Sequence, residues 1–168
     1  KDLSKHVSVS VVHPLMKENG WELTNDYPST TGDPILGKSS IYEIYLAANS
    51  CVTSRASVPV LWDKKRGTIV SNESAEIIRM FNSAFDGITG NMEDYYPAEL
   101  RSKIDAINTD IYSNINNGVY KTGFASTQSA YTKSVRKLFA QLDQLEELLS
   151  KQRYLLGETI TEADWRLF

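Results

Sequence analysis

The sequence has 168 residues, 41% of them hydrophobic, and a formal net charge of −3. This composition is typical of a folded globular protein and argues against disorder. Acidic and basic residues nearly balance, so nothing in the composition supports binding to nucleic acid. No apolar run approaches the roughly 18 to 20 residues that a membrane-spanning helix needs. The composition therefore predicts a protein without a nucleic-acid or membrane partner.

Cysteine usage and the two chain ends add to this picture. Cys51 is the only cysteine, which excludes an internal disulfide or a CxxC redox pair and favours a reducing, cytoplasmic location. The chain starts at Lys1 and stops a few residues after the helix-start pattern Thr161-Glu162-Ala163-Asp164. We therefore expect the sequence to be truncated at both ends.

The first half of the chain predicts strands and helices in alternation. Alternating valines at residues 7–12 indicate a β-strand, and residues 39–48 carry the apolar spacing of a short helix. Between them, residues 13–38 form a long polar stretch of the kind that is either functional or disordered. Residues 58–62 and 68–70 flank a five-residue turn and predict an antiparallel hairpin. A helix over 73–81 follows, with Asn72 as its expected cap.

The second half predicts helices. Gly87 and Gly90 mark a linker at 86–97. Two amphipathic helices follow, with a connection expected near 118–126. Their apolar positions recur every three or four residues: Leu100, Ile104, Ile107, Ile111 and Ile115, then Tyr131, Val135, Leu138, Leu142, Leu145 and Leu148.

Two dipeptides are candidates for a binding site. A proline at Val58-Pro59 removes a ladder donor, which indicates either a cis peptide in a special turn or a trans proline on an edge strand. Glu73-Ser74 opens a helix, where free N–H groups and the Ser74 hydroxyl suit a carboxylate and Glu73 suits an ammonium group. The alternative is that these residues only cap the helix.

A strand, a helix, a Val-Pro hairpin and a Glu-Ser helix, followed by helices alone, resemble the glutathione transferases. Longer segments are similar to the glutathionyl-hydroquinone reductases, the xi-class or omega-like branch of that family. These segments are residues 9–16 with Asn19-Gly20-Trp21, 58–65, 69–82 and 116–121. The resemblance covers nearly the whole chain.

The resemblance implies an α/β plus all-α fold. Residues 1–85 would form an incomplete thioredoxin-like domain that lacks its first strand and helix. Residues 86–97 would be the linker, and 98–168 part of an all-helical transferase domain. In isolation, we expect such a chain to fold poorly and to be inactive.

The resemblance also implies a site and a reaction. Glutathione would be bound by Trp21, Arg55, Val58, Glu73 and Ser74, with Pro59 as the structural cis-proline and without a metal. Tyr120 would hydrogen-bond the quinol or move its proton, although a buried structural tyrosine is the competing interpretation. The expected activity is reduction of S-glutathionyl-hydroquinones in a cytoplasmic homodimer, with glutathione as cosubstrate.

One part of the family pattern does not occur here. The family's nucleophile is a cysteine in Cys-Pro-Trp-Ala, which no segment of this sequence matches. Cys51, His6 and His13 are interpreted as bystander or structural residues. Two alternatives stay open: a non-catalytic binding protein that keeps the transferase frame, and a conventional glutathione transferase.

Overall fold

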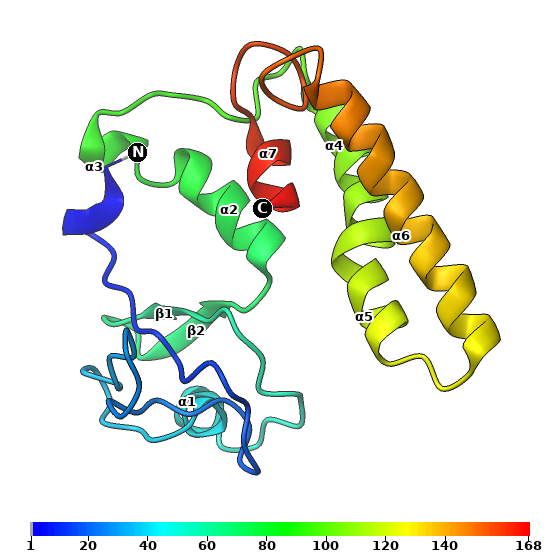
Figure 1. Cartoon of the computed structure of the whole chain (residues 1–168). Helices are drawn as coiled ribbons and strands as arrows, with labels where there is room; N and C mark the ends of the chain where they lie inside the picture. The colour runs from blue at the N-terminus through cyan, green and yellow to red at the C-terminus, as the bar shows by residue number, and fades with distance from the viewer. Residues whose placement is uncertain (1) are drawn as a thin grey trace. The chain divides into compact units, whose positions relative to one another are not determined.

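The computed structural model describes residues 2–168 and divides into two compact units, which meet in sequence between Asn91 and Met92 (Figure 1). This point lies inside the predicted linker 86–97, but the first four residues of that stretch, Asp86–Thr89, form a short helix of the first unit. Each unit has its own buried apolar cluster, and each is described by itself below.

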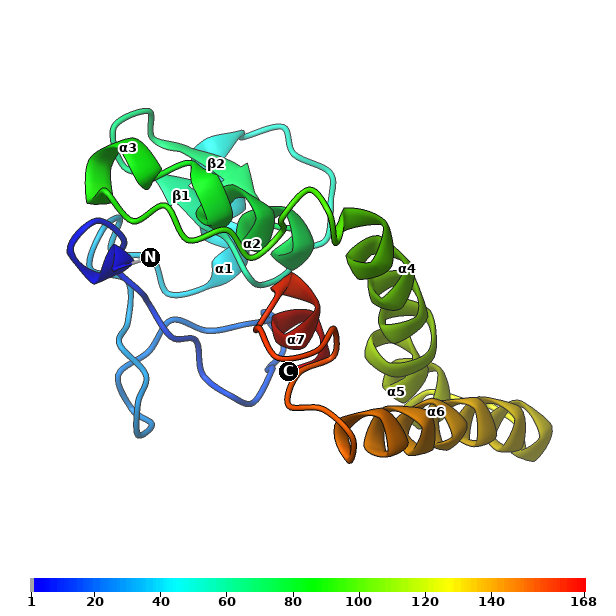
Figure 2. The ribbon, with the colours of Figure 1, turned by 90° about the horizontal axis from the view of Figure 1, so that it is seen from above.

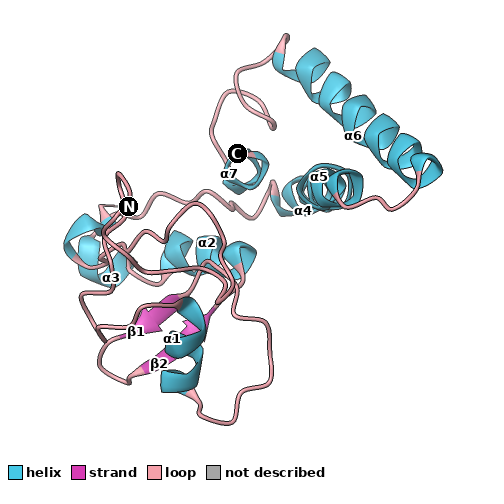
Figure 3. Cartoon of the chain, turned by 60° about the horizontal axis from the view of Figure 1, so that its bottom comes forward, coloured by secondary structure: helices cyan, strands magenta, loops and turns pink. Residues whose placement is uncertain are grey.

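The first unit contains one antiparallel hairpin and several helices. Its elements in chain order are the 3₁₀ turn η1 (Leu3–Lys5), α1 (Ile41–Ala48), β1 (Leu61–Asp63), β2 (Thr68–Ser71), α2 (Ser74–Ser83) and α3 (Asp86–Thr89). β1 and β2 pair with each other in the only sheet of the described residues. Helix α1 packs beside β2 (Figure 3).

The core of this unit forms around α1. Leu23, Ile41, Ile44 and Tyr45 are buried together. The half-buried side chains that surround them include Val12, Trp21, Val60 and Trp62. α1 begins at Ile41 because Ser40 and Glu43 form a capping box, in which Glu43 Oε2 accepts the Ser40 N–H at 3.0 Å.

The predicted strand at residues 7–12 is wrong. This segment belongs to no strand, and Val9 is 75% exposed. Its backbone bonds to the long loop instead: the Val11 N–H donates to Thr31 Oγ1 at 2.9 Å, and the Val11 carbonyl accepts the Thr31 N–H at 3.4 Å. Alternating valines favour an extended backbone, but a strand also needs a neighbouring ladder, and none of the described residues supplies one.

The predicted cap of α2 is also wrong. Glu73 occupies the N-cap position in extended conformation, and α2 begins at Ser74. Asn72 lies one residue too early to cap the helix, and its amide bonds elsewhere. The predicted hairpin is present, but its first strand begins at Leu61 instead of residue 58, and a bulge lies between Leu61 and Trp62.

The second unit is helical throughout. Its elements are α4 (Arg101–Ile111), the π-helical segment η2 (Tyr112–Asn116), α5 (Asn117–Gly123), α6 (Gln128–Leu149) and α7 (Glu162–Leu167). α5 lies against α6 (Figures 1 and 2). The buried cluster joins the helices through side chains on the predicted stripes, among them Ile104, Ile111, Leu138 and Leu145.

The predicted connection near 118–126 begins too early. Gly118 lies inside α5 and is buried, and the helix continues to Gly123. The connection is short and ends at Thr127, whose side chain accepts the Ala130 N–H at 3.2 Å and caps α6. A glycine in a helix can serve close packing as well as a turn, and here it faces Leu138.

The start of α7 is a capping box, as the sequence pattern indicated. Asp164 Oδ2 accepts the Thr161 N–H at 2.8 Å, and Asp164 Oδ1 accepts the Leu155 N–H at 2.8 Å. Thr161 and Glu162 are both 1% exposed, and Glu162 Oε1 accepts from Asn108 Nδ2 of α4 at 3.1 Å. Trp165 packs edge-on against Tyr95, with 4.4 Å between ring centroids. Among the described residues, no helix is long and apolar enough to cross a membrane.

Candidate functional site

The Val58-Pro59 peptide bond is cis in the structure. It lies just ahead of β1, so the backbone of Val58 is presented at the entrance to the hairpin. Val58 is 36% exposed, and Ala56 and Ser57 before it are half-buried. Arg55 lies exposed in the same loop. The segment therefore places an exposed arginine three residues before a partly exposed Val58.

Glu73 and Ser74 lie at the start of α2, and both are exposed. The buried hydroxyl of Ser71 holds this start in place: Ser71 Oγ accepts the Glu73 N–H at 3.1 Å and donates to Glu76 Oε2 at 2.9 Å. The N-terminus of a helix presents unsatisfied N–H groups and a partial positive charge. Ser74 thus lies where an anion is favoured, beside a carboxylate that can receive a cation.

A hydrogen-bond network that the sequence did not reveal joins these two features. The Tyr45 hydroxyl of α1 donates to the Ser57 carbonyl at 3.0 Å and accepts from Asn72 Nδ2 at 2.9 Å. Asn72 Nδ2 also bonds Ser57 Oγ at 3.2 Å. Tyr45 had been assigned only to the apolar stripe and Asn72 only to a cap. The available signal was that a buried tyrosine hydroxyl needs a hydrogen-bond partner.

Trp21 is half-buried and packs against the cluster of Leu23, Ile41, Ile44 and Tyr45. Its carbonyl accepts the Ile41 N–H at 2.9 Å, which ties the long loop to the first turn of α1. This packing makes Trp21 a hydrophobic anchor for the long loop. Contact between the indole and a ligand stays a prediction.

Tyr120 belongs to the second unit and is 64% exposed among the described residues, which favours the site interpretation over a buried structural tyrosine. Its ring stacks on that of Phe124, one turn later in sequence, with centroids 6.3 Å apart and planes 3° from parallel. Phe124 is itself 83% exposed. The pair presents a flat aromatic surface and a phenol to solvent.

Other reactive side chains have ordinary surroundings. Cys51 is exposed, in the loop after α1. His13 Nδ1 accepts a hydrogen bond from the Leu15 N–H, and the imidazole ring packs against the Tyr27 ring with 5.1 Å between their centroids. No group of three or more histidine, cysteine or acidic residues within 2–168 is arranged to hold a metal.

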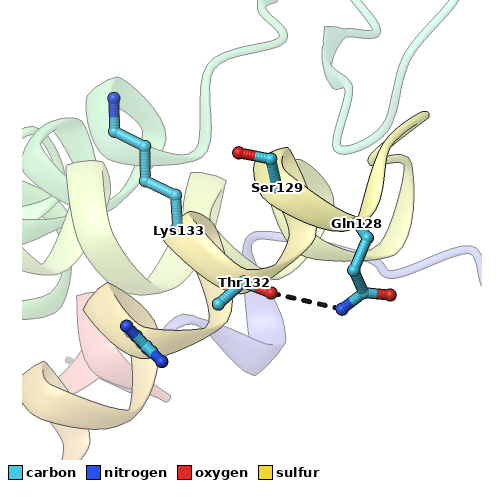
Figure 4. Close-up of a pocket in the computed structure, with 5 residues that line it drawn as sticks. Gln128, Ser129, Thr132 and Lys133 are labelled. Carbon is cyan, nitrogen blue, oxygen red and sulfur yellow. Dashed lines mark hydrogen bonds between the residues drawn. The ribbon is translucent and has the colours of Figure 1, made fainter.

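An open hollow lies on the first turns of α6 (Figure 4). Five residues line it: Gln128, Ser129, Thr132, Lys133 and Arg136. All of them come from one helix, so the hollow is a gap between neighbouring side chains and offers a ligand no converging groups.

A cis-proline before a hairpin, a Glu-Ser helix start and a separate helical unit define the class of fold: a thioredoxin-like half with a glutathione-transferase helical half. The family model for the glutathione S-transferase C-terminal domain matches residues 128–168.

Comparison with known proteins narrows the class. The chain is 53% identical over its whole length to the glutathionyl-hydroquinone reductase YqjG of Escherichia coli K12, and spans 51% of that protein. It is 48% identical to the glutathionyl-hydroquinone reductase PcpF of Sphingobium chlorophenolicum, over 100% of this chain and 53% of PcpF. The chain therefore spans about half the length of these relatives.

Solved structures agree with the sequence relatives. The glutathione-bound structure of YqjG superimposes with a TM-score of 0.94 over 98% of this chain and 54% of that one. The glutathione-S-transferase Xi of Phanerochaete chrysosporium has a TM-score of 0.94 at 47% identity, over 98% of this chain and 57% of the other. Over the length that it shares with them, the chain is therefore similar in sequence and in fold to the xi-class glutathione transferases.

Proposed function

We propose that the protein carrying this chain reduces S-glutathionyl-hydroquinones to hydroquinones and releases glutathione disulfide. The observation that carries the proposal is the cis Val58-Pro59 bond in the same unit as the exposed Glu73-Ser74 helix start. Relatives about half identical to this chain are named for the same activity, which supports it.

The chain supplies the residues that bind glutathione. The Val58 backbone pairs with the cysteinyl part of the tripeptide. Ser74 and the N–H groups that begin α2 receive the γ-glutamyl carboxylate, and Glu73 receives its ammonium group. Arg55 is the proposed partner of a glutathione carboxylate, and Trp21 the proposed packing surface. These are complementary contacts, because glutathione carries both charges of a free amino acid at one end.

The chemistry needs a thiolate that these residues do not include. A cysteine in the family's Cys-Pro-Trp-Ala segment attacks the glutathionyl sulfur of the substrate. The bond from that sulfur to the aromatic carbon breaks, the carbon takes a proton, and hydroquinone leaves. A second glutathione thiolate then attacks the mixed disulfide, so glutathione disulfide forms and the cysteine thiolate returns. The sulfurs lose the two electrons that the aromatic carbon gains.

Tyr120 is proposed to act on the quinol. Its exposed phenol can donate a hydrogen bond to a substrate hydroxyl or transfer its proton. The stacked Phe124 adds an apolar surface that suits an aromatic ring. We further propose that the complete protein is a cytoplasmic homodimer, which measurement of its mass in solution would test.

The test is to incubate the complete protein with a glutathionyl-hydroquinone and glutathione, and to quantify hydroquinone and glutathione disulfide. We expect equal amounts of the two products. Glu73→Ala should raise the KM for glutathione about 10- to 100-fold, because it removes a charge-assisted hydrogen bond. The matched control is Glu18→Ala, an exposed carboxylate in the long loop.

The alternatives give different results. A conventional transferase would conjugate glutathione to electrophiles and leave glutathionyl-hydroquinones unchanged. A binding protein would hold glutathione without turnover of either substrate. Either result would refute the reductase proposal.

A further inference from the structure

We propose that Tyr45 and Asn72 are positioning residues of the glutathione site, which fix the Val58 backbone relative to the start of α2. The inference rests on the proposed function, since it concerns how that site is held. Neither residue needs to touch the ligand. They act through Ser57, directly before Val58, and through the link between β2 and α2, directly before Glu73.

The geometry of the network assigns donors and acceptors to Tyr45 and Asn72. A tyrosine hydroxyl has one hydrogen, which Tyr45 donates to the Ser57 carbonyl at 3.0 Å. The hydroxyl oxygen is then free to accept, and Asn72 Nδ2 donates to it at 2.9 Å. Asn72 Nδ2 also donates to Ser57 Oγ at 3.2 Å, and the Tyr45 and Ser57 hydroxyl oxygens lie 3.3 Å apart. Each of the three residues therefore bonds to the other two.

The network is anchored in the core. Tyr45 is 7% exposed and packs with Leu23, Ile41 and Ile44, so its hydroxyl is a fixed point. Ser57 and Asn72 are separated by 15 residues, and the whole hairpin lies between them. Because Ser57 and Asn72 both bond the Tyr45 hydroxyl, the hairpin between them cannot move in a way that changes the distance from Val58 to Glu73.

That distance matters because one ligand spans both places. The cysteinyl backbone pairs at Val58, and the γ-glutamyl group binds at Glu73 and Ser74. A rigid spacing lowers the ordering cost that the ligand would otherwise meet on binding. The network therefore favours ligands that carry both groups over ligands that carry one.

The experiment compares two ligands in the complete protein. Dissociation constants for glutathione and for cysteinylglycine, which lacks the γ-glutamyl group, are measured for wild type, Tyr45→Phe and Asn72→Ala. We expect each variant to raise the dissociation constant for glutathione about 3- to 10-fold, which corresponds to the loss of one net hydrogen bond. The dissociation constant for cysteinylglycine should change much less. The KM for glutathione should rise by the same factor while kcat stays near the wild-type value.

Two controls complete the design. Tyr42→Phe removes a hydroxyl from an exposed tyrosine of the same helix and should leave both affinities unchanged. In the double variant, the fold-increase in the dissociation constant for glutathione should be smaller than the product of the two single fold-increases, because both residues act on Ser57.

The outcomes separate the two proposals. Equal glutathione affinity in wild type and both variants, or equal weakening of both ligands, would overturn the positioning role while leaving the proposed function in place. A wild-type protein that binds no glutathione would overturn both.

Discussion

The carboxylate of Asp33 holds the loop that leads into α1. Its oxygens accept the backbone N–H groups of Ile35, Leu36 and Lys38 at 3.0 to 3.2 Å. Burial acts to raise the pKa of Asp33, but these hydrogen bonds outweigh it and lower the pKa below its ordinary value. Asp33 thus orders the last part of the long polar stretch, a role that composition alone does not predict.

Asp33→Asn should destabilise the protein by about 1 kcal/mol at pH 7. The reason is that the backbone N–H groups would then donate to a neutral amide oxygen instead of a charged carboxylate. The folded-state pKa lies below the unfolded one, so this stabilisation is complete above about pH 4 and is lost as the pH falls through the folded-state pKa. Urea unfolding at pH 7 and pH 3 checks this, with the exposed Asp110→Asn as control. If the difference in the free energy of unfolding between variant and wild type were the same at pH 3 as at pH 7, the prediction would be wrong.

Asn72 shows where prediction at the residue scale stops. Its type and position suit a helix cap, and the helix does begin two residues later. The alternative partner, Tyr45, lies 27 residues away and meets it only in the folded unit. Glu73 and Ser74 could be located from the sequence because their position depends on local helix signals. The network beside them depends on tertiary contact.

At the scale of elements, the spacing of apolar residues predicted α4 and α6 correctly, but the position of the connection between the helices is seen only in the structure. Gly118 suggested a turn. It is instead a contact point between α5 and α6, where a methyl group would meet Leu138 Cδ1 at 3.6 Å and Cβ at 3.8 Å. Both distances are ordinary van der Waals contacts, so the site has room for one carbon.

Gly118→Ala should therefore stabilise the protein, by about 0.5 to 1 kcal/mol, because alanine restricts the unfolded chain and favours a helix. Gly118→Leu should destabilise it, since the larger side chain would displace Leu138. Thermal unfolding of both variants measures the effect. A destabilised alanine variant would show that the helices pack more tightly than these distances indicate.

The Asp164 carboxylate of the capping box joins the start of α7 to the preceding loop. Asp164 accepts from the Thr161 N–H, the Thr161 hydroxyl and the Leu155 N–H. Asp164→Ala should cost about 2 to 3 kcal/mol, because three hydrogen bonds are lost at a nearly buried helix start. Denaturant unfolding measures this, and Asp143→Ala on the exposed face of α6 is the matched control. If the two variants unfolded at the same denaturant concentration, the predicted role of Asp164 would be refuted.

At the scale of the molecule, the hairpin and the helices α1, α2, α4 and α6 could be predicted because each segment carries its own apolar period, caps or turn residues, whereas the short helices α3 and α5 could not. The strand at residues 7–12 could not be, because a strand exists only with its neighbour. The single hairpin of the described residues is similarly dependent, since two strands alone are marginally stable in water. The first unit therefore owes its stability to the core around α1, where Tyr45 and Trp21 pack.

The three tryptophans are divided between the two units. Trp21 and Trp62 lie half-buried against the core of the first, whereas Trp165 of the second packs edge-on against Tyr95. Each unit thus has its own optical reporter. Emission from a Trp165→Phe variant would follow the first unit alone, and emission from a variant that retains only Trp165 would follow the second. Fluorescence can therefore distinguish one cooperative unfolding transition from two, without any added label.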